Sequence, residues 1–261
     1  MTAPLVLLHA FPFGPALWSP VVEQLEADPT WRRPILTPAL PGFADTALPS
    51  SPPDLAVTAH EIARTIGVDG PIILGGVSLG GYVAMALAGQ RPDLLAGLIL
   101  VDTKAGADSP PAHAARLLMA DQADQEPATV GPLLVAQLLP KLLSDQTFRD
   151  RSSVVDEVRN WLQHATPAAV AWYQRAMAKR TSSLELLGAL TCPTLVLYGD
   201  EDHLSPAAEQ DQMVAVLRKG QRQVLTWLGT DPGGRARRAS HRRQARPRRI
   251  PTSPASFVRL G

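Results

Sequence analysis

The sequence has almost none of the features that cross-link secreted proteins or anchor chains in a bilayer. It contains a single cysteine, Cys192, among 261 residues, so no disulfide framework can form within the chain. No apolar run approaches the ~20 residues of a membrane span, and the first residues lack the charged segment of a signal peptide. These absences predict a protein of the reducing cytoplasm that makes no contact with a membrane.

Charge is unevenly distributed, although the net value is only +1. Residues 1–228 hold 16 Lys and Arg against 23 Asp and Glu, a net of −7, whereas residues 229–261 hold nine Arg, no Lys and one acid, a net of +8. Arg, Pro and Ser dominate this basic tail. Such a composition cannot bury enough apolar surface to fold, so we expect the tail to be disordered.

Short apolar runs alternate with helix-like segments through much of the chain. The runs that predict strands lie at residues 5–8, 34–40, 98–102, 194–198 and 223–227, and the segments that predict helices at residues 15–26, 54–66 and 206–217. This alternation indicates an α/β fold in which helices flank a mostly parallel sheet. We assign residues 1–103 and 181–228 to this core.

The alternation stops between residues 104 and 180. Four helix-like stretches follow one another there without a strand signal, near residues 112–123, 130–143, 153–165 and 167–179. We interpret the segment as a helical lid inserted between two strands of the sheet. Additional helices packed on one face of the sheet are the alternative.

Residues 71–88, PIILGGVSLGGYVAMALA, combine a strand-like run, a glycine-rich turn and an apolar helix. In that setting the G-x-S-x-G motif around Ser78 predicts a nucleophile elbow. Gly76 and Gly80 leave room for the tight turn, and the amide of Leu79 at the helix N-terminus can stabilise a nearby oxyanion. A plain strand-to-helix turn in a Rossmann-like sheet is the alternative.

A serine nucleophile needs a base, and a third group must orient that base. Asp202 follows the predicted strand 194–198 and so lies at the carboxyl end of a parallel strand, where α/β sheets gather catalytic groups. We predict that Asp202 is the acid of a catalytic triad. Asp102, at the end of the preceding strand, is the second candidate, and Asp200 and Glu201 are interpreted as turn or helix-capping charges.

The loop after the first predicted strand begins His9-Ala10-Phe11-Pro12. A loop at this place can supply a second oxyanion donor, here the backbone N–H of Phe11 beside that of Leu79. His9 precedes the serine in the chain, so we interpret it as a structural histidine that bonds to the loop backbone.

Five stretches together, HAFPFGPALW, LPGF, GGVSLGGYVAMALA, LVDTKAGAD and YGDEDHLSP, resemble the α/β-hydrolase fold family. More narrowly they resemble its small lidded esterases and enol-lactonases, of the 3-oxoadipate enol-lactonase type. The resemblance implies a serine hydrolase with Ser78 as nucleophile, Asp202 as triad acid and the Phe11 and Leu79 amides as oxyanion hole. It implies no metal and no organic cofactor, with the lid setting substrate access.

The chain departs from this family after residue 227. In the family the last strand leads into a Gly-His pair that carries the catalytic histidine, followed by an amphipathic helix. Here the chain reads WLGTDPGGRARRASHRRQ, with no Gly-His pair. His203 is too close in sequence to the acid to serve as its partner comfortably, so His241, set among arginines, is the remaining candidate base.

A shifted reading frame is our hypothesis for the tail. Trp227 to Thr230 is encoded by TGG-CTN-GGN-ACN; read two bases later, with CTG for Leu and GGC for Gly, these bases give Ala-Gly-His. The rival hypothesis is a genuine basic tail that contacts nucleic acid or an anionic surface. Because we favour the frameshift, nucleic acid is the less favoured partner. Finding the same tail in an intact frame in independent isolates would exclude the frameshift.

The predicted function is hydrolysis of a carboxylic ester or lactone, with a small molecule as the partner. Acyl transfer or cofactor-free peroxidation on the same site is one alternative. A catalytically silent protein that binds ligands in the lidded pocket is another. The sequence does not indicate the substrate or the oligomeric state.

Overall fold

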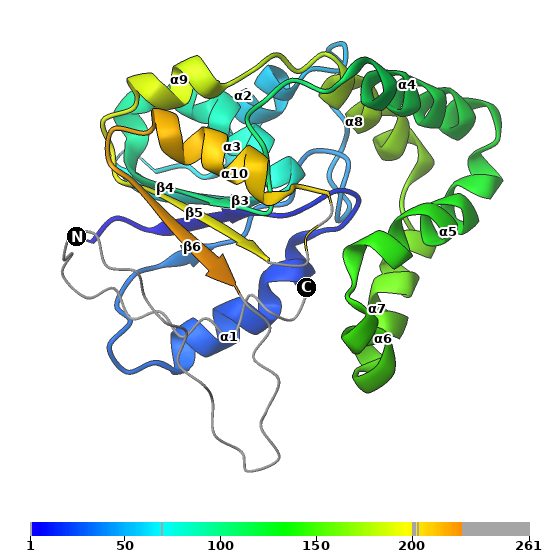
Figure 1. Ribbon diagram of the computed structural model, residues 1–261, viewed down its shortest axis with the longest axis horizontal. Coiled ribbons are helices and arrows are strands. Elements are labelled where there is room, and N and C mark those ends of the chain that lie inside the picture. Colours follow the sequence, from blue (N-terminus) through cyan, green and yellow to red (C-terminus); the bar gives the residue numbers. More distant parts are fainter. Residues whose placement is uncertain (1, 69, 200–201, 203, 226–261) are drawn as a thin grey trace.

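The computed structural model describes residues 2–68, 70–199, 202 and 204–225. In this part of the chain six parallel strands form one sheet in the order β2-β1-β3-β4-β5-β6 (Figure 1). The strands are β1 Leu5–Leu8, β2 Ile35–Leu36, β3 Ile72–Val77, β4 Leu95–Val101, β5 Thr194–Gly199 and β6 Gly220–Leu225. The predicted disorder of residues 229–261 concerns residues outside the described ones.

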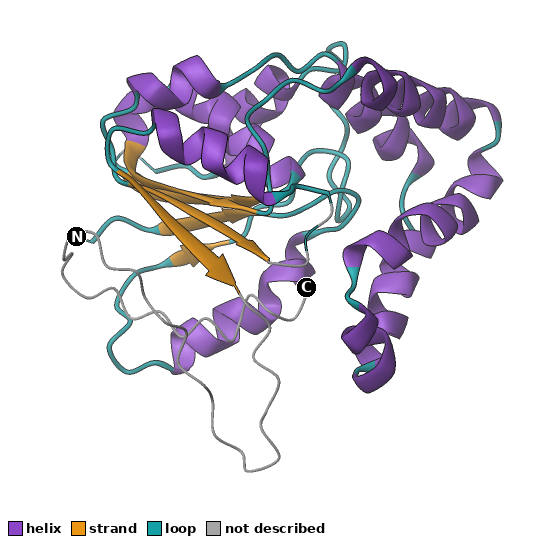
Figure 2. Cartoon of the chain, viewed as in Figure 1, coloured by secondary structure: helices purple, strands orange, loops and turns teal. Residues whose placement is uncertain are grey.

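Helices cover both faces of the sheet, and a further group lies beyond its carboxyl edge (Figure 2). Helix α1 packs on one face, and α2, α3, α9 and α10 lie on the other (Figure 1). The helices are α1 Ser19–Ala27, α2 Leu55–Thr65, α3 Leu79–Gln90, α4 Pro110–Gln125, α5 Val130–Leu142, α6 Asp145–Asp150, α7 Ser152–Gln163, α8 Pro167–Ala178, α9 Leu184–Ala189 and α10 Ala207–Val216.

The alternation of side chains along each strand explains why both faces are covered. Val6 and Leu8 of β1 join the large core beneath α3, whereas Leu5 and Leu7 pack against Trp18 on the side of α1. A strand buried in this way has no polar face, which is why its sequence is continuously apolar. The structure confirms the predicted α/β fold with a mostly parallel sheet.

Helix α3 is the central helix of the large core. Nearly all its residues are buried, including Val83, Met85 and Leu87 at 0% exposure. Its sequence is apolar on every side, as expected for a helix enclosed by the sheet and its neighbours. This enclosure fixes the direction of α3 and therefore the position of its first turn.

Between β4 and β5, where every residue is described, the chain forms the helices α4 to α9 and no strand. The four predicted helical stretches are all present. The sequence analysis missed two short helices, α6 and α9, which are one to two turns long and carry too few residues to show a helical period. Figure 1 shows α4 to α7 at the side toward which the arrowheads of β5 and β6 point.

Several predicted elements have different bounds in the structure; the strand expected at 98–102, for example, is β4, Leu95–Val101. The helix expected at 15–26 is a 3₁₀ turn, Pro15–Trp18, followed by α1, because Pro20 lacks an N–H and fits the first turn of a new helix. The strand expected at 34–40 pairs over Ile35–Leu36 alone. Strand β6 begins at Gly220, earlier than predicted, because an edge strand can carry polar residues that show no apolar pattern.

Among the described residues, no helix combines the length and the apolar composition that crossing a bilayer would require.

Candidate active site

Ser78 occupies the sharp turn between β3 and α3. Its backbone has φ 51° and ψ −111°, a region that non-glycine residues rarely adopt. The Ser78 amide donates to the carbonyl of Val101 (2.9 Å), and the Ser78 carbonyl accepts from the amides of Gly81 (3.0 Å) and Tyr82 (3.2 Å). These bonds hold the strained residue between the neighbouring strand and the first turn of α3.

Two glycines make this turn possible because other backbone passes close to them. A Cβ on Gly76 would lie 2.2 Å from the carbonyl oxygen of Gly80, and a Cβ on Gly80 would lie 2.2 Å from that of Leu8. The start of α3 therefore lies directly against the end of β1. This contact accounts for the glycines of the motif by close approach alone, since neither has a positive φ.

We predict that Gly80→Ala lowers the free energy of unfolding by about 3 kcal/mol, at the upper end of overpacking changes, since the clash is with backbone. Urea unfolding measures it. Gly89→Ala, on the same helix, is the matched control, because its Cβ would meet only a side chain, at an ordinary 3.4 Å. Equal stability of the two variants would contradict the close approach at Gly80.

The predicted oxyanion donors are on the two segments that meet at Gly80. Leu79 is the first residue of α3, so its amide is one of the N–H groups that a helix leaves without a partner. Phe11 lies in the turn after β1, which contains a cis Phe11–Pro12 peptide bond. Neither amide donates to another group within the described residues.

His9 is a structural residue of this loop, as predicted. It is fully buried, and its Nε2 accepts a hydrogen bond from the amide of Leu40 (3.0 Å). Since Nε2 accepts, Nδ1 carries the proton and donates to the carbonyl of Ala10 (3.0 Å). Burial lowers the pKa of His9 to about 4, so the ring stays neutral and joins the loop after β1 to the chain that follows β2.

Asp202 lies in the turn between β5 and α10. Its Oδ1 accepts from the amides of Leu204 (2.7 Å) and Ser205 (3.0 Å), which fix the carboxylate at the start of that turn. Its Oδ2 is buried and accepts no N–H among the described residues, and the neighbouring polar side chain is the carboxyl of Asp102. A buried carboxylate oxygen needs a donor, which the protonated carboxyl of Asp102 or a group outside the described residues can supply.

Asp102, the second candidate acid, lies beside Asp202. It follows β4 with φ 40°, and its Oδ1 accepts from the amide of Gly199 (2.9 Å). Burial above all, together with the charge and the hydrogen bond of Asp202 and against the opposing effect of the Gly199 bond, raises the pKa of Asp102 to about 7. The two candidate acids therefore form a close carboxyl pair.

A raised pKa makes this pair a source of pH-dependent stability. Because the folded-state pKa of Asp102 exceeds its unfolded value, its contribution is complete at low pH and is lost as pH rises toward 7. Asp102→Asn resembles the protonated acid, so we predict that the variant lacks this loss. Relative to the wild type, the free energy of unfolding of the variant should rise by on the order of 1–3 kcal/mol from pH 4 to pH 8.

Unfolding curves across this pH range test the prediction. Asp45→Asn is the matched control, since Asp45 also has a positive φ, 64°, but is exposed. Parallel pH profiles for wild type and Asp102→Asn would show that Asp102 does not carry the shifted proton.

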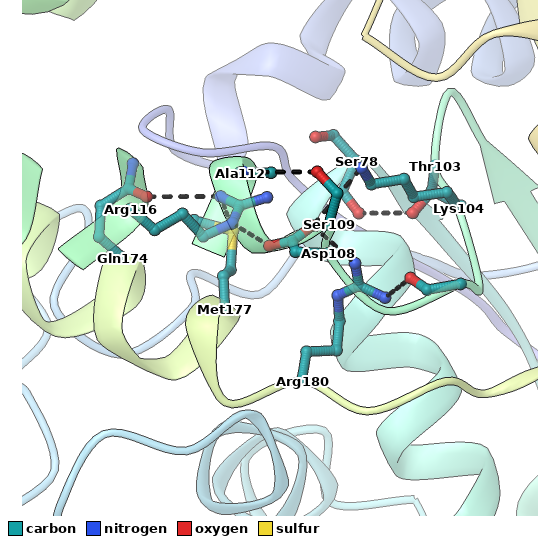
Figure 3. Close-up of polar contacts among 11 residues, drawn as sticks. Ser78, Thr103, Lys104, Asp108, Ser109, Ala112, Arg116, Gln174, Met177 and Arg180 are labelled. Carbon is teal, nitrogen blue, oxygen red and sulfur yellow. Dashed lines mark hydrogen bonds and ion pairs between the residues drawn. The ribbon is translucent and has the colours of Figure 1, made fainter. Parts of the chain in front are cut away.

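A second buried carboxylate, Asp108, gathers three cations where the chain leaves β4 (Figure 3). Its side chain is 3% exposed and pairs with Arg116, with Arg180 (3.1 Å) and with Lys104 (3.4 Å). Burial alone would raise the pKa of Asp108, but Arg116 above all, and then the other two cations, hold it below its usual value. The guanidinium of Arg180 also lies 4.2 Å from the ring centroid of Tyr82 on α3.

This cluster joins both ends of the segment 104–180 to α3, because Lys104 and Arg116 lie near the beginning of the segment and Arg180, which contacts Tyr82, lies at its end. Sequence reasoning did not single out these residues. The available signal was Asp108, the second acid of LVDTKAGAD, since a carboxylate buried near a strand needs charged or hydrogen-bonding partners.

The described residues place no histidine at the carboxylates. His60, His113 and His164 are exposed, and none of them hydrogen-bonds to Ser78 or Asp202. The candidate base His241, and His203, Asp200 and Glu201, lie outside the described residues. The described part of the chain also holds no group of three or more His, Cys, Asp or Glu side chains able to bind a metal ion.

Comparison with known proteins assigns the family. A model of the alpha/beta hydrolase family matches residues 5–250, and the chain belongs to that family. A pimeloyl-acyl-carrier-protein methyl ester esterase of Aromatoleum aromaticum is 29% identical over 224 residues, which cover 82% of this chain and 85% of the relative.

Solved structures agree with the assignment. A thermophilic esterase of Thermogutta terrifontis, solved with malate bound, is 34% identical with a TM-score of 0.79, covering 87% of this chain and 82% of that one. An enol-lactonase of Burkholderia xenovorans LB400 has a TM-score of 0.74 at 19% identity, covering 86% and 83% of the two chains, and supports the fold alone.

Proposed function

We propose that the chain hydrolyses carboxylic esters or lactones through an acyl-enzyme formed on Ser78. The observation that carries the proposal is the strained backbone of Ser78 at the first turn of a buried helix, beside two amides that make no other described hydrogen bond. The esterase names of the relatives support an ester as the substrate.

In the proposed reaction a base takes the proton of the Ser78 hydroxyl while Oγ bonds to the substrate carbonyl carbon. The carbonyl oxygen becomes an oxyanion, which the amides of Leu79 and Phe11 stabilise. Collapse of this intermediate breaks the ester bond, and the alcohol leaves with the proton from the base. Water then attacks the acyl-enzyme in the same way and releases the acid.

Asp202 is the group that we propose orients the base. The buried Oδ2 of Asp202 supports this role, because it accepts no N–H among the described residues and an imidazole at that place would supply one. The base itself comes from outside the described residues, where the sequence offers His203 and His241. Triad members act as a unit, so a chain whose base is poorly placed would turn over several orders of magnitude more slowly.

We further propose that the helical segment 104–180 acts as a lid over Ser78. Its helices α7 and α8 contact the loops that follow β1 and β2: Phe13 and Trp161 have ring centroids 5.4 Å apart, and Tyr173 donates to the carbonyl of Pro41 (2.9 Å). The carboxyl ends of parallel strands are where open α/β sheets bind ligands, so a cover at these loops controls access.

The nucleophile is tested with a fluorophosphonate probe, which forms a covalent bond with an activated serine. We predict labelling of the wild type and of the control Ser153→Ala, an exposed serine in the first turn of α7. Ser78→Ala should not be labelled. An unlabelled wild type, observed by gel fluorescence beside a known serine esterase, would favour the silent binding protein.

A further inference from the structure

Two buried polar side chains connect the turn of Ser78 with the turn of Asp202. Thr103 and Gln210 are both 0% exposed, and neither belongs to the catalytic groups proposed above. Thr103 follows β4 and Gln210 lies in the middle of α10. Buried polar groups in a hydrolase core require partners, and the partners of these two are the turns that bear the nucleophile and the acid.

Thr103 contacts the elbow directly. Its Oγ1 donates to the carbonyl of Ser78 (2.9 Å; Figure 3). It also packs against the first turn of α3, since a Cβ on Gly81 would lie 2.6 Å from the same Oγ1. The hydroxyl therefore fixes the carbonyl of the nucleophile and leaves no room for α3 to shift toward β4.

Gln210 continues the connection to the acid. Its Nε2 donates to the carbonyl of Thr103 (2.8 Å) and to the carbonyl of Ser205 (3.0 Å). The amide of Ser205 donates in turn to Oδ1 of Asp202 (3.0 Å). A continuous path of hydrogen bonds, joined through the residues that make them, thus runs from Ser78 through Thr103, Gln210 and Ser205 to Asp202.

We propose that Thr103 and Gln210 are positioning residues that hold the acid-bearing turn in register with the nucleophile elbow. The role rests on the proposed function, because it concerns the geometry of that reaction. Neither residue touches the reacting atoms: Thr103 acts through the Ser78 backbone and Gln210 through Ser205.

The amide of Gln210 is only partly satisfied, and its two hydrogen bonds both come from Nε2. Its Oε1 is buried and finds no partner among the described residues, whereas the neighbouring buried position of α10 on the same side is the apolar Met213. The Nε2 of Gln210, by contrast, satisfies two backbone carbonyls, and removing this donor would leave both of them without it at a cost in stability. The two bonds from Nε2 are what the glutamine adds.

The register matters because catalysis is sensitive to small displacements. Ser78 and Asp202 come from different turns of the sheet edge, and a misplacement of about 1 Å can lower a rate 10²-fold. The Ser78 carbonyl also accepts from the amides of Gly81 and Tyr82, so a change in its direction would turn the first amides of α3, including that of Leu79.

Gln210→Met tests the proposal, since methionine keeps the length of the side chain and loses both donors. We predict that kcat for p-nitrophenyl acetate falls roughly 10- to 100-fold with KM unchanged in the folded protein, and that the unfolding midpoint falls below that of the control because two buried carbonyls lose their donor. Gln212→Met is that control, an exposed glutamine on the same helix, and should keep wild-type kcat.

Thr103→Val and Thr103→Ser provide the second readout. Valine preserves the branched shape without the hydroxyl and should lower kcat as Gln210→Met does, whereas serine retains the donor and should restore most of it. A purely structural role would not separate kcat from KM, and it would not be rescued by the hydroxyl alone.

The outcomes separate this proposal from the function on which it rests. If Ser78→Ala abolishes turnover but Gln210→Met and Thr103→Val keep wild-type kcat, the positioning role is wrong and the function stands. If the wild type turns over no faster than Ser78→Ala, both the proposed function and the positioning role are overturned.

Discussion

The close approach of the β3–α3 turn to the end of β1 is the constraint on which the rest of the site depends. Gly80 lies so near Leu8 that only a hydrogen fits between the two backbones. This contact holds Ser78 in its strained conformation and brings the first amides of α3 beside the loop that carries Phe11. The buried α3 makes the arrangement rigid, since the helix cannot withdraw from the sheet without opening the core.

Three buried carboxyl groups lie near this turn, and each is stabilised by different partners. Asp108 is neutralised by three cations, which also tie the helical segment to α3. Asp202 is held by two backbone amides through one oxygen only. Asp102 has no cation among its described partners, and its burial beside Asp202 favours the protonated form. The site therefore depends on hydrogen bonds to backbone more than on ion pairs.

Much of the fold was predictable because its strands and helices have strong local patterns. The β3–α3 stretch joins an apolar run, a glycine-rich turn and an apolar helix, and this order predicts a strand, a tight turn and a buried helix. Asp202 could also be predicted as a candidate acid, because a carboxylate directly after a parallel strand lies at the sheet edge where catalytic groups gather. Edge strands such as β6 were harder to delimit, because polar residues are tolerated there.

The connections within the site were not predictable from the sequence. Thr103 and Gln210 meet only because β4 and α10 lie side by side in the fold, and a lone buried glutamine leaves no pattern along the chain. The pairing of Asp102 with Asp202 has the same origin. Sequence reasoning treated these two acids as alternatives, whereas the structure makes them neighbours, which only the order of the strands could reveal.

The central claim is that Ser78 carries the acyl group during turnover. The protein is mixed with excess p-nitrophenyl acetate and the reaction is quenched rapidly. Intact-protein and peptide mass spectrometry then measure directly whether an acetyl group is bound and to which residue. The account predicts one added acetyl group, located on Ser78 and absent from Ser78→Ala. Acetylation confined to other residues while the ester is hydrolysed would contradict it.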